Sequence, residues 1–254
     1  GGEYNVAIGN YSLNANTTGD YNVAVGYNSL TGNTTGNYVT AIGGKALQAN
    51  TTGTGNTAVG TNAMESNTTG ASNTVMGWNA LVTNTTGSNN LAMGVNTMFY
   101  NTTGYKNVAL GDYGLWANTE GMENVAISGN GSLYKNTTGS QNIAIGAASL
   151  YNNETGNYNI AIGRSSLYNN TASNNVGIGH ESLKSNTTGT DNVGVGYKAL
   201  NATTTGKDNA ALGREALLSN TTGDFNIAIG SGALFTSTTA DQNVAIGYGA
   251  MYYN

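Results

Sequence analysis

The sequence predicts an all-β fold, a parallel β-solenoid of about fifteen coils, and three observations support it. A glycine that ends a Val-Ala-Ile-like run recurs fifteen times, and twelve of the fourteen spacings are 17 residues. Asn, Thr and Gly dominate the segments between the runs, whereas charged residues are only 8% of the chain. Proline, which cannot donate into a backbone ladder, is absent. A period that persists along the whole chain indicates an array of stacked units.

Each unit holds a short strand, a corner and a loop. In the first unit Val6-Ala7-Ile8 is the expected strand, Gly9 ends it, Leu13 follows the corner and Asn16-Thr17-Thr18-Gly19 is the loop. Asn and Gly tolerate the positive φ of tight turns, and their frequency leaves no length for a helix. Stacked strands lie about 4.8 Å apart and share their backbone hydrogen bonds. We expect residues 1–254 to form one continuous array, uncapped at both ends and part of a longer fibre.

Residues at the same position of successive coils form columns, and two columns predict interior structure. The Leu13 position holds Leu twelve times and Met at 64, 98 and 251, which predicts a buried apolar column. The Asn5 position holds Asn in fourteen of fifteen coils, with Val39 as the exception. Stacked amides can bond along the axis, so we expect an Asn ladder there.

The strand triplet is apolar on both faces. Val6 and Ile8 share one face and Ala7 takes the other, whereas a strand with one wet face alternates apolar and polar residues. We therefore expect one face in the core and the other against a second chain. Small side chains suit a close symmetric contact, so the alanine column is the candidate oligomer interface; a monomer with an alanine-rich outer face is the alternative. The column comprises Ala7, Ala24, Ala41, Ala58, Ala92, Ala109, Ala126, Ala144, Ala161, Ala211, Ala228 and Ala245.

The motif Val6-Ala7-Ile8-Gly9, followed by two residues and Ser12, resembles the head repeat of YadA-like trimeric autotransporter adhesins. Similar repeats with an Asn-Thr-Thr-Gly loop occur in bacterial surface proteins and phage tail fibres. The resemblance extends over all fifteen coils, although the family's coil is shorter and has Ser at the Asn5 position. It implies a left-handed β-roll, a homotrimer and an extracellular location at a cell surface or on a virion.

Two further columns are candidate surfaces. The residue after the core Leu is aromatic in five consecutive coils, which stabilises the ladder or forms a strip for a host-surface glycan or receptor: Phe99, Trp116, Tyr134, Tyr151 and Tyr168. The Asn-Thr-Thr-Gly loop is either a structural turn ladder, a Thr lattice for ice that Glu120 and Glu154 interrupt, or an Asn-linked glycosylation acceptor.

The residues favour no catalytic, cofactor or metal site. His180 is the only histidine and is expected in a solvated turn, and cysteine is absent. Gly177-Ile178-Gly179 precedes no helix that could bind a pyrophosphate. The net charge of −5 and the scattered cations argue against nucleic-acid binding, and no apolar run is long enough to cross a bilayer.

The predicted function is therefore that of a non-enzymatic structural segment of an extracellular fibre or surface adhesin, bacterial or phage. Its expected partner is itself, as a homotrimer or an end-to-end filament. The alternative is a ligand-binding solenoid that uses the Thr or aromatic column to bind ice, a glycan or a receptor.

Overall fold

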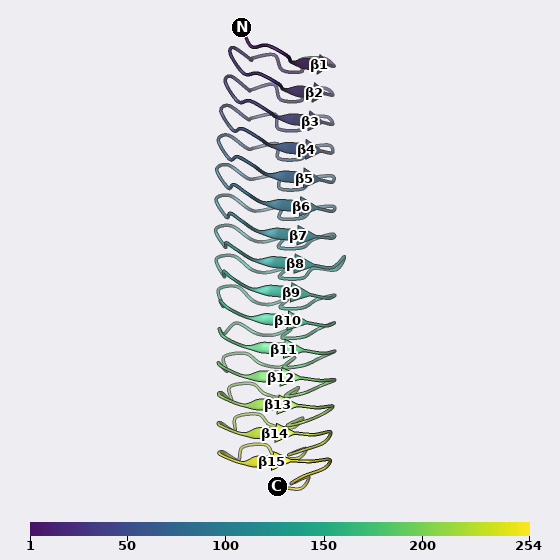
Figure 1. The fold of residues 1–254 in the computed structure, drawn as a ribbon, viewed down its shortest axis with the longest axis vertical. Helices are drawn as coiled ribbons and strands as arrows, with labels where there is room; N and C mark the ends of the chain where they lie inside the picture. The colour runs from purple at the N-terminus through teal and green to yellow at the C-terminus, as the bar shows by residue number, and fades with distance from the viewer. The chain divides into compact units, whose positions relative to one another are not determined.

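The computed structural model describes residues 1–254, which divide into two compact units, Gly1–Gly129 and Asn130–Asn254. Each unit is a parallel β-solenoid with no helix, so the predicted all-β, parallel-solenoid architecture is confirmed (Figure 1). The division coincides with the one insertion in the repeat, because Gly111 and Gly129 are 18 residues apart instead of 17.

Every coil contributes one strand of three residues. The strands of the first unit are β1 (Val6–Ile8), β2 (Val23–Val25), β3 (Thr40–Ile42), β4 (Thr57–Val59), β5 (Thr74–Met76), β6 (Leu91–Met93), β7 (Val108–Leu110) and β8 (Val125–Ile127). Those of the second unit are β9 (Ile143–Ile145), β10 (Ile160–Ile162), β11 (Val176–Ile178), β12 (Val193–Val195), β13 (Ala210–Leu212), β14 (Ile227–Ile229) and β15 (Val244–Ile246).

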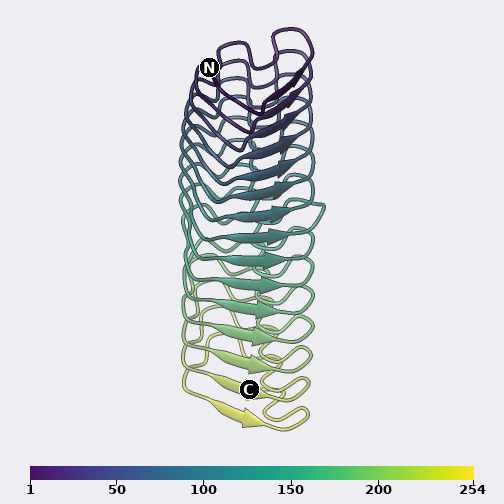
Figure 2. The same cartoon turned by 45° about the horizontal axis from the view of Figure 1, so that its top comes forward.

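Within each unit, neighbouring strands pair in parallel and in register, so that identical positions lie above one another. Val6 pairs with Val23 and Ala7 with Ala24. The same register holds across the one 16-residue coil, where Ile160 pairs with Val176. Figure 2 shows the strands of each unit forming one wall, while the loops run back around the other sides of the coil.

Backbone hydrogen bonds also join the coils outside the strands. The N–H of Leu13 donates to the carbonyl of Ser29 at 3.0 Å, and the N–H of Thr17 donates to the carbonyl of Thr34 at 2.9 Å. The corner and the loop are therefore stacked ladders like the strand, which satisfies backbone groups that burial would otherwise leave unpaired.

The interior of each coil is thin and is filled by the Leu column and two columns of small residues. Leu30 and Leu47 are fully buried, as predicted for this column. A side chain built at Gly114, in the Ser12 column, would place its Cβ 3.6 Å from the Cβ of Ala109. The Ser12 column therefore faces the strand's alanines across the interior, and both columns hold small side chains, with Val75 and Thr97 as the largest buried members.

The prediction that the alanine column forms an oligomer interface is wrong, because these side chains point into their own coil. They are at most 2% exposed in every coil after the first: Ala24, Ala41, Ala58, Ala92, Ala109, Ala126, Ala144, Ala161, Ala211, Ala228 and Ala245. Only Ala7, in the first coil, is exposed. Alanine is small here because the coil is narrow, and the outward face of each strand belongs to its first and third residues.

The glycine that ends each strand is required by its backbone conformation. Gly26 has a φ of +136°, and a Cβ there would lie 2.6 Å from the carbonyl oxygen of Gly43 in the next coil. Both the left-handed backbone and the close approach of neighbouring coils exclude a side chain at this column.

The buried Leu column also has a left-handed backbone, with φ of 52° at Leu30 and 53° at Leu81. This conformation costs an L-residue with a side chain roughly 1–2 kcal/mol. The Leu30 N–H donates to the carbonyl of Ala46 at 2.9 Å, and that of Leu81 donates to the carbonyl of Thr97 at 2.9 Å. Stacking on the next coil therefore stabilises a conformation that an isolated coil would not keep.

Candidate binding surfaces

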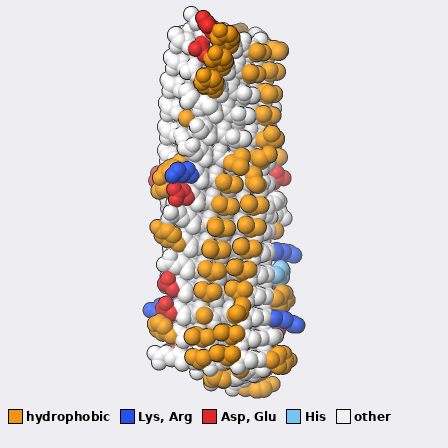
Figure 3. Space-filling model, viewed as in Figure 1, with side chains coloured by type: hydrophobic (Ala, Val, Ile, Leu, Met, Phe, Trp, Pro, Cys, Tyr) orange, Lys and Arg blue, Asp and Glu red, His pale blue; other side chains and the backbone are white.

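The first and third residues of β1–β15 point outward on both sides of the buried alanine, and we call these two columns the apolar strip of each unit. Leu212 is 52% exposed, Ile229 is 39% exposed and Met76 is 48% exposed. Figure 3 shows these side chains as two rows of hydrophobic atoms over the strands of the second unit. No member of the strip is charged, and its only polar members are Thr40, Thr57 and Thr74. An uncharged apolar surface of this regularity is typical of an interaction site.

Of the five aromatic residues that the sequence analysis singled out, two lie in the first unit and three in the second. In the second unit the rings of Tyr134 and Tyr151 stack at 4.9 Å, and those of Tyr151 and Tyr168 stack at 5.2 Å. In the first unit the rings of Phe99 and Trp116 are tilted by 30° with centroids 6.4 Å apart. Parallel stacking covers both faces of Tyr151, so the ladder presents ring edges rather than the faces on which a sugar ring packs.

The Asn-Thr-Thr-Gly loop uses its first two side chains to hold the coils together. The Asn33 Nδ2 donates to the carbonyl of Gly36 at 3.0 Å and to Asn16 Oδ1 at 3.1 Å. The Thr34 hydroxyl donates to the carbonyl of Thr51 in the next coil at 3.1 Å. Because Asn33 is fully buried, its amide is not accessible as a glycosylation acceptor in the folded chain. The second Thr of this loop, Thr35, is exposed, and in the loop at 186–189 both Thr187 and Thr188 are exposed.

His180 is exposed, as predicted, and its ring stacks on that of Tyr197 at 5.6 Å. The neighbouring Glu181 carboxylate accepts a hydrogen bond of 2.6 Å from Lys184 and lies 3.7 Å from the amine of Lys198. The hydrogen bond from Lys184 lowers the pKa of Glu181, although partial burial opposes the shift. No group of three or more His, Cys, Asp or Glu side chains in residues 1–254 is placed to hold a metal ion.

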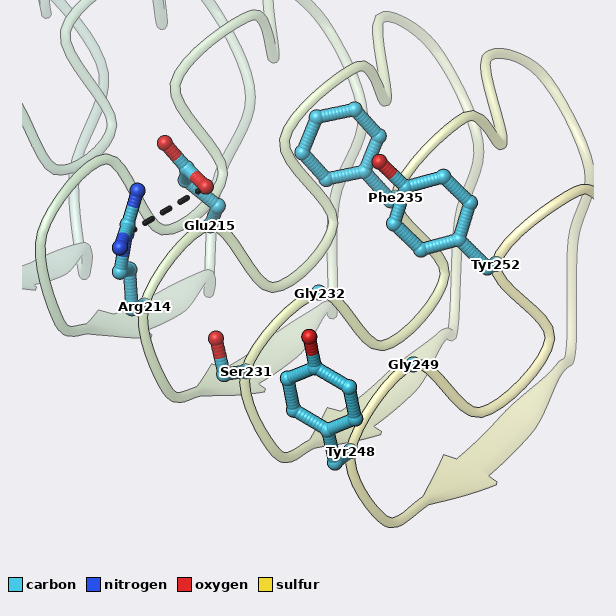
Figure 4. A pocket seen from close by; sticks show the side chains of 8 residues that line it. All are labelled: Arg214, Glu215, Ser231, Gly232, Phe235, Tyr248, Gly249 and Tyr252. Carbon is cyan, nitrogen blue, oxygen red and sulfur yellow. Dashed lines mark ion pairs between the residues drawn. The ribbon is translucent and has the colours of Figure 1, made fainter.

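A groove on the side of the second unit is a feature that sequence reasoning missed. It encloses about 240 Å³ and spans three consecutive coils, where it is lined by Arg214, Glu215, Ser231, Gly232, Phe235, Tyr248, Gly249 and Tyr252 (Figure 4). The sequence signal was a glycine two residues after the strand-ending glycine, with an aromatic residue three positions later. Gly232 precedes Phe235 in this way, and Gly249 precedes Tyr252.

The structure contains no helix with the length and hydropathy that a membrane span needs. In comparisons with known proteins, no family model matches the chain, and no curated protein is significantly similar to it.

Proposed function

We propose that this chain is a non-enzymatic structural segment of an extracellular fibre or surface adhesin, of a bacterial appendage or a phage tail fibre. In this proposal identical chains associate through the apolar strip into a homotrimer, with coils wound left-handed as the YadA-like resemblance implies. The observation that carries the proposal is the position of the strip, which faces outward, is half-buried to exposed, carries no charge and recurs on every coil of both units.

The strip favours a second copy of the same chain as its partner. Two copies have the same coil spacing, so the ridges on one strip can match the grooves on the other at every coil within a unit. Each buried Å² of apolar surface contributes roughly 25 cal/mol, and no charged group has to be desolvated in the strip. A small gain per coil therefore adds up along the repeat, and closed cyclic symmetry limits the assembly to a defined number of chains.

The ladders inside each coil supply stiffness. Backbone hydrogen bonds join successive coils at the strand, the corner and the loop, as at Val23, Leu30 and Thr34. Extension of one coil against the next has to break all of these bonds together. Such an arrangement suits a rod that transmits force and is unsuited to a hinge.

Sedimentation equilibrium together with negative-stain electron microscopy tests this proposal. We expect the native chain to sediment as a trimer at micromolar concentration and to form elongated particles. The double variant Ile162→Lys, Leu212→Lys puts two charges on the strip and should sediment as a monomer.

The matched control is Thr188→Lys, Thr205→Lys, which adds the same charge at exposed loop positions of the same unit and should remain trimeric. A native chain that stays monomeric, or a strip variant that associates as tightly as the control, would contradict the proposal.

A further inference from the structure

The groove of the second unit exists because side chains are missing from its floor. Gly232 and Gly249 have φ of 68° and 60°, but Asn79 and Lys198 adopt φ of 53° at the same position of other coils. The backbone therefore does not demand glycine there. What the two glycines provide is space, and a Cβ at Gly232 would meet only the Tyr252 ring, at 3.5 Å.

Aromatic side chains form the walls of this space. The rings of Phe235 and Tyr252 stack at 4.7 Å with an angle of 5° between their planes. Figure 4 shows this pair on one side of the two glycines and Tyr248 on the other, with the Ser231 hydroxyl beside Tyr248. The groove encloses about 240 Å³, which is less than the roughly 300 Å³ at the lower end of pockets for drug-sized ligands. Its volume therefore suits a smaller ligand, of about the size of one sugar ring.

One end of the groove carries a guanidinium group. The Nε of Arg214 lies 3.5 Å from the Glu215 carboxylate, which occupies one side of the fork. The side chain of Arg214 is 68% exposed, so its terminal amino groups can reach a ligand in the groove. A guanidinium fork matches a carboxylate in geometry and charge.

The groove continues a cationic edge on an acidic protein. Arg164, His180, Tyr197 and Arg214 follow the strand-ending glycines of four consecutive coils, and the N–H of Glu215 donates to the carbonyl of Tyr197 at 2.8 Å. At the right edge in Figure 3 the single histidine lies between Lys and Arg side chains of this unit. With Lys184 and Lys198, this edge has four of the unit's six Lys and Arg residues but only two of its seven Asp and Glu residues, Glu181 and Glu215. An anionic chain is attracted along such an edge.

We propose that this groove binds a carboxylated sugar residue of an acidic polysaccharide. Arg214 pairs with the sugar carboxylate. The Glu215 carboxylate accepts hydrogen bonds from ring hydroxyls, and the Ser231 hydroxyl accepts or donates them. The Tyr248 ring, which is 91% exposed, packs its open face against the C–H groups, and the stacked pair of Phe235 and Tyr252 closes the opposite side with its ring edges. A single-stranded nucleic acid fits less well, because the rings of His180 and Tyr197 stack on each other at 5.6 Å and have no gap for a base.

Isothermal titration calorimetry of the full chain at low ionic strength tests the site. The probes are a tetrasaccharide of α-1,4-linked galacturonic acid and its methyl ester, which has the same rings without the charge. We expect the acid to bind and the ester to bind at least about tenfold more weakly, because a charge-assisted hydrogen bond is lost.

Two variants separate the charge from the shape. Arg214→Gln removes the carboxylate partner, and Gly232→Asn fills the floor with a residue that Asn79 shows the backbone accepts. Each should weaken binding of the acid by about tenfold. Their controls are Lys106→Gln, which removes a cation paired with Glu123 in the first unit, and Gly55→Asn, in a column where Asn89 has a φ of 59°. Both controls should bind as the native chain does.

Three results would overturn the site: no binding of the acid, equal binding of acid and ester, or full binding by Gly232→Asn. Circular dichroism of each variant checks the fold, so that a loss of binding is not mistaken for unfolding. None of these outcomes affects the trimer, which is measured separately by sedimentation.

Discussion

The backbone N–H of Asn73 donates a hydrogen bond of 3.0 Å to the side-chain oxygen of Asn56, one coil earlier. The side-chain oxygen of Asn73 in turn accepts from the backbone N–H of Asn90 at 2.9 Å, and its Nδ2 donates to the carbonyl of Gly87 at 3.0 Å. Asn56 and Asn73 are fully buried. Asn73 therefore bonds both the coil before it and the coil after it.

Replacing Asn73 by Ala should lower the free energy of unfolding by about 2 kcal/mol, because the buried N–H of Asn90 loses its acceptor. Gly87 keeps a second donor, Asn84 Nδ2 at 3.0 Å, and adds little to the loss. Hydrogen exchange checks the effect locally, since the Asn90 amide should exchange faster. Thr86→Ala, at an exposed loop position, is the control and should leave exchange at Asn90 unchanged.

Replacing Leu81 by Ala should destabilise the first unit by about 2–5 kcal/mol, since the side chain is fully buried and its removal leaves a cavity. Leu81→Met should cost less than about 1.5 kcal/mol. Met64 and Met98 occupy the same column in the coils on either side, so the site accepts Met. Chemical denaturation measures both variants, and equal losses would contradict the packing argument.

Gly26→Ala should destabilise the first unit by more than about 3 kcal/mol, because its Cβ would meet the Gly43 carbonyl at 2.6 Å in a left-handed backbone. Gly44→Ala is the matched control. A Cβ at Gly44 has only the Thr61 methyl within reach, at 4.0 Å. Thermal unfolding should separate the two variants clearly, and a mild effect at Gly26 would refute the close approach of the coils.

Glu181 gives a pH-dependent contribution whose sign follows from its lowered pKa. A carboxyl whose folded-state pKa lies below its ordinary value, about 4.3, stabilises the fold above that value and loses the contribution as the pH falls through the folded-state pKa. Because the pair with Lys184 is partly exposed, Glu181→Gln should cost at most about 1 kcal/mol at neutral pH.

The stability difference between Glu181→Gln and the native chain should disappear well below pH 4, where both side chains are uncharged. Glu154→Gln, at an exposed loop position, is the control and should show little difference at either pH. Thermal melts across this pH range check the prediction. A difference that persists in acid would show that hydrogen bonding without charge is responsible.

The coils, their strands and the Leu and Asn columns could be predicted from the sequence, because a fixed period places equivalent residues above one another whatever the details of one coil. Which face of the strand points into the core could not be predicted, because both faces are apolar. Ala24 points inward because the interior is narrow, and its width is set by Leu30 and by the small Ser29 opposite the strand.

The left-handed Leu column and the groove were missed for related reasons. Single-residue preferences place Gly or Asn, not Leu, at positive φ, and here the stacked neighbour overrides the preference at Leu30. The groove depends on residues from three coils, Arg214, Gly232 and Tyr252 among them, whose proximity follows only after the register is known. A column-by-column comparison of side-chain size would have indicated Gly131, Gly232 and Gly249.

The 16-residue coil, in which Ile160 still pairs with Val176, affects how the second unit reaches its native alignment. Near-identical coils could pair one step out of place and keep almost all of their contacts, so a perfectly uniform array would have many misfolded states of similar energy. The short loop matches only one position in the stack. The short loop therefore fixes the register of the coils around it. In a displaced alignment, bonds such as the one from the Asn157 N–H to the Ser173 hydroxyl, 3.0 Å long in the native arrangement, are lost. The one shortened repeat thus favours a single register in a chain whose other coils are nearly identical.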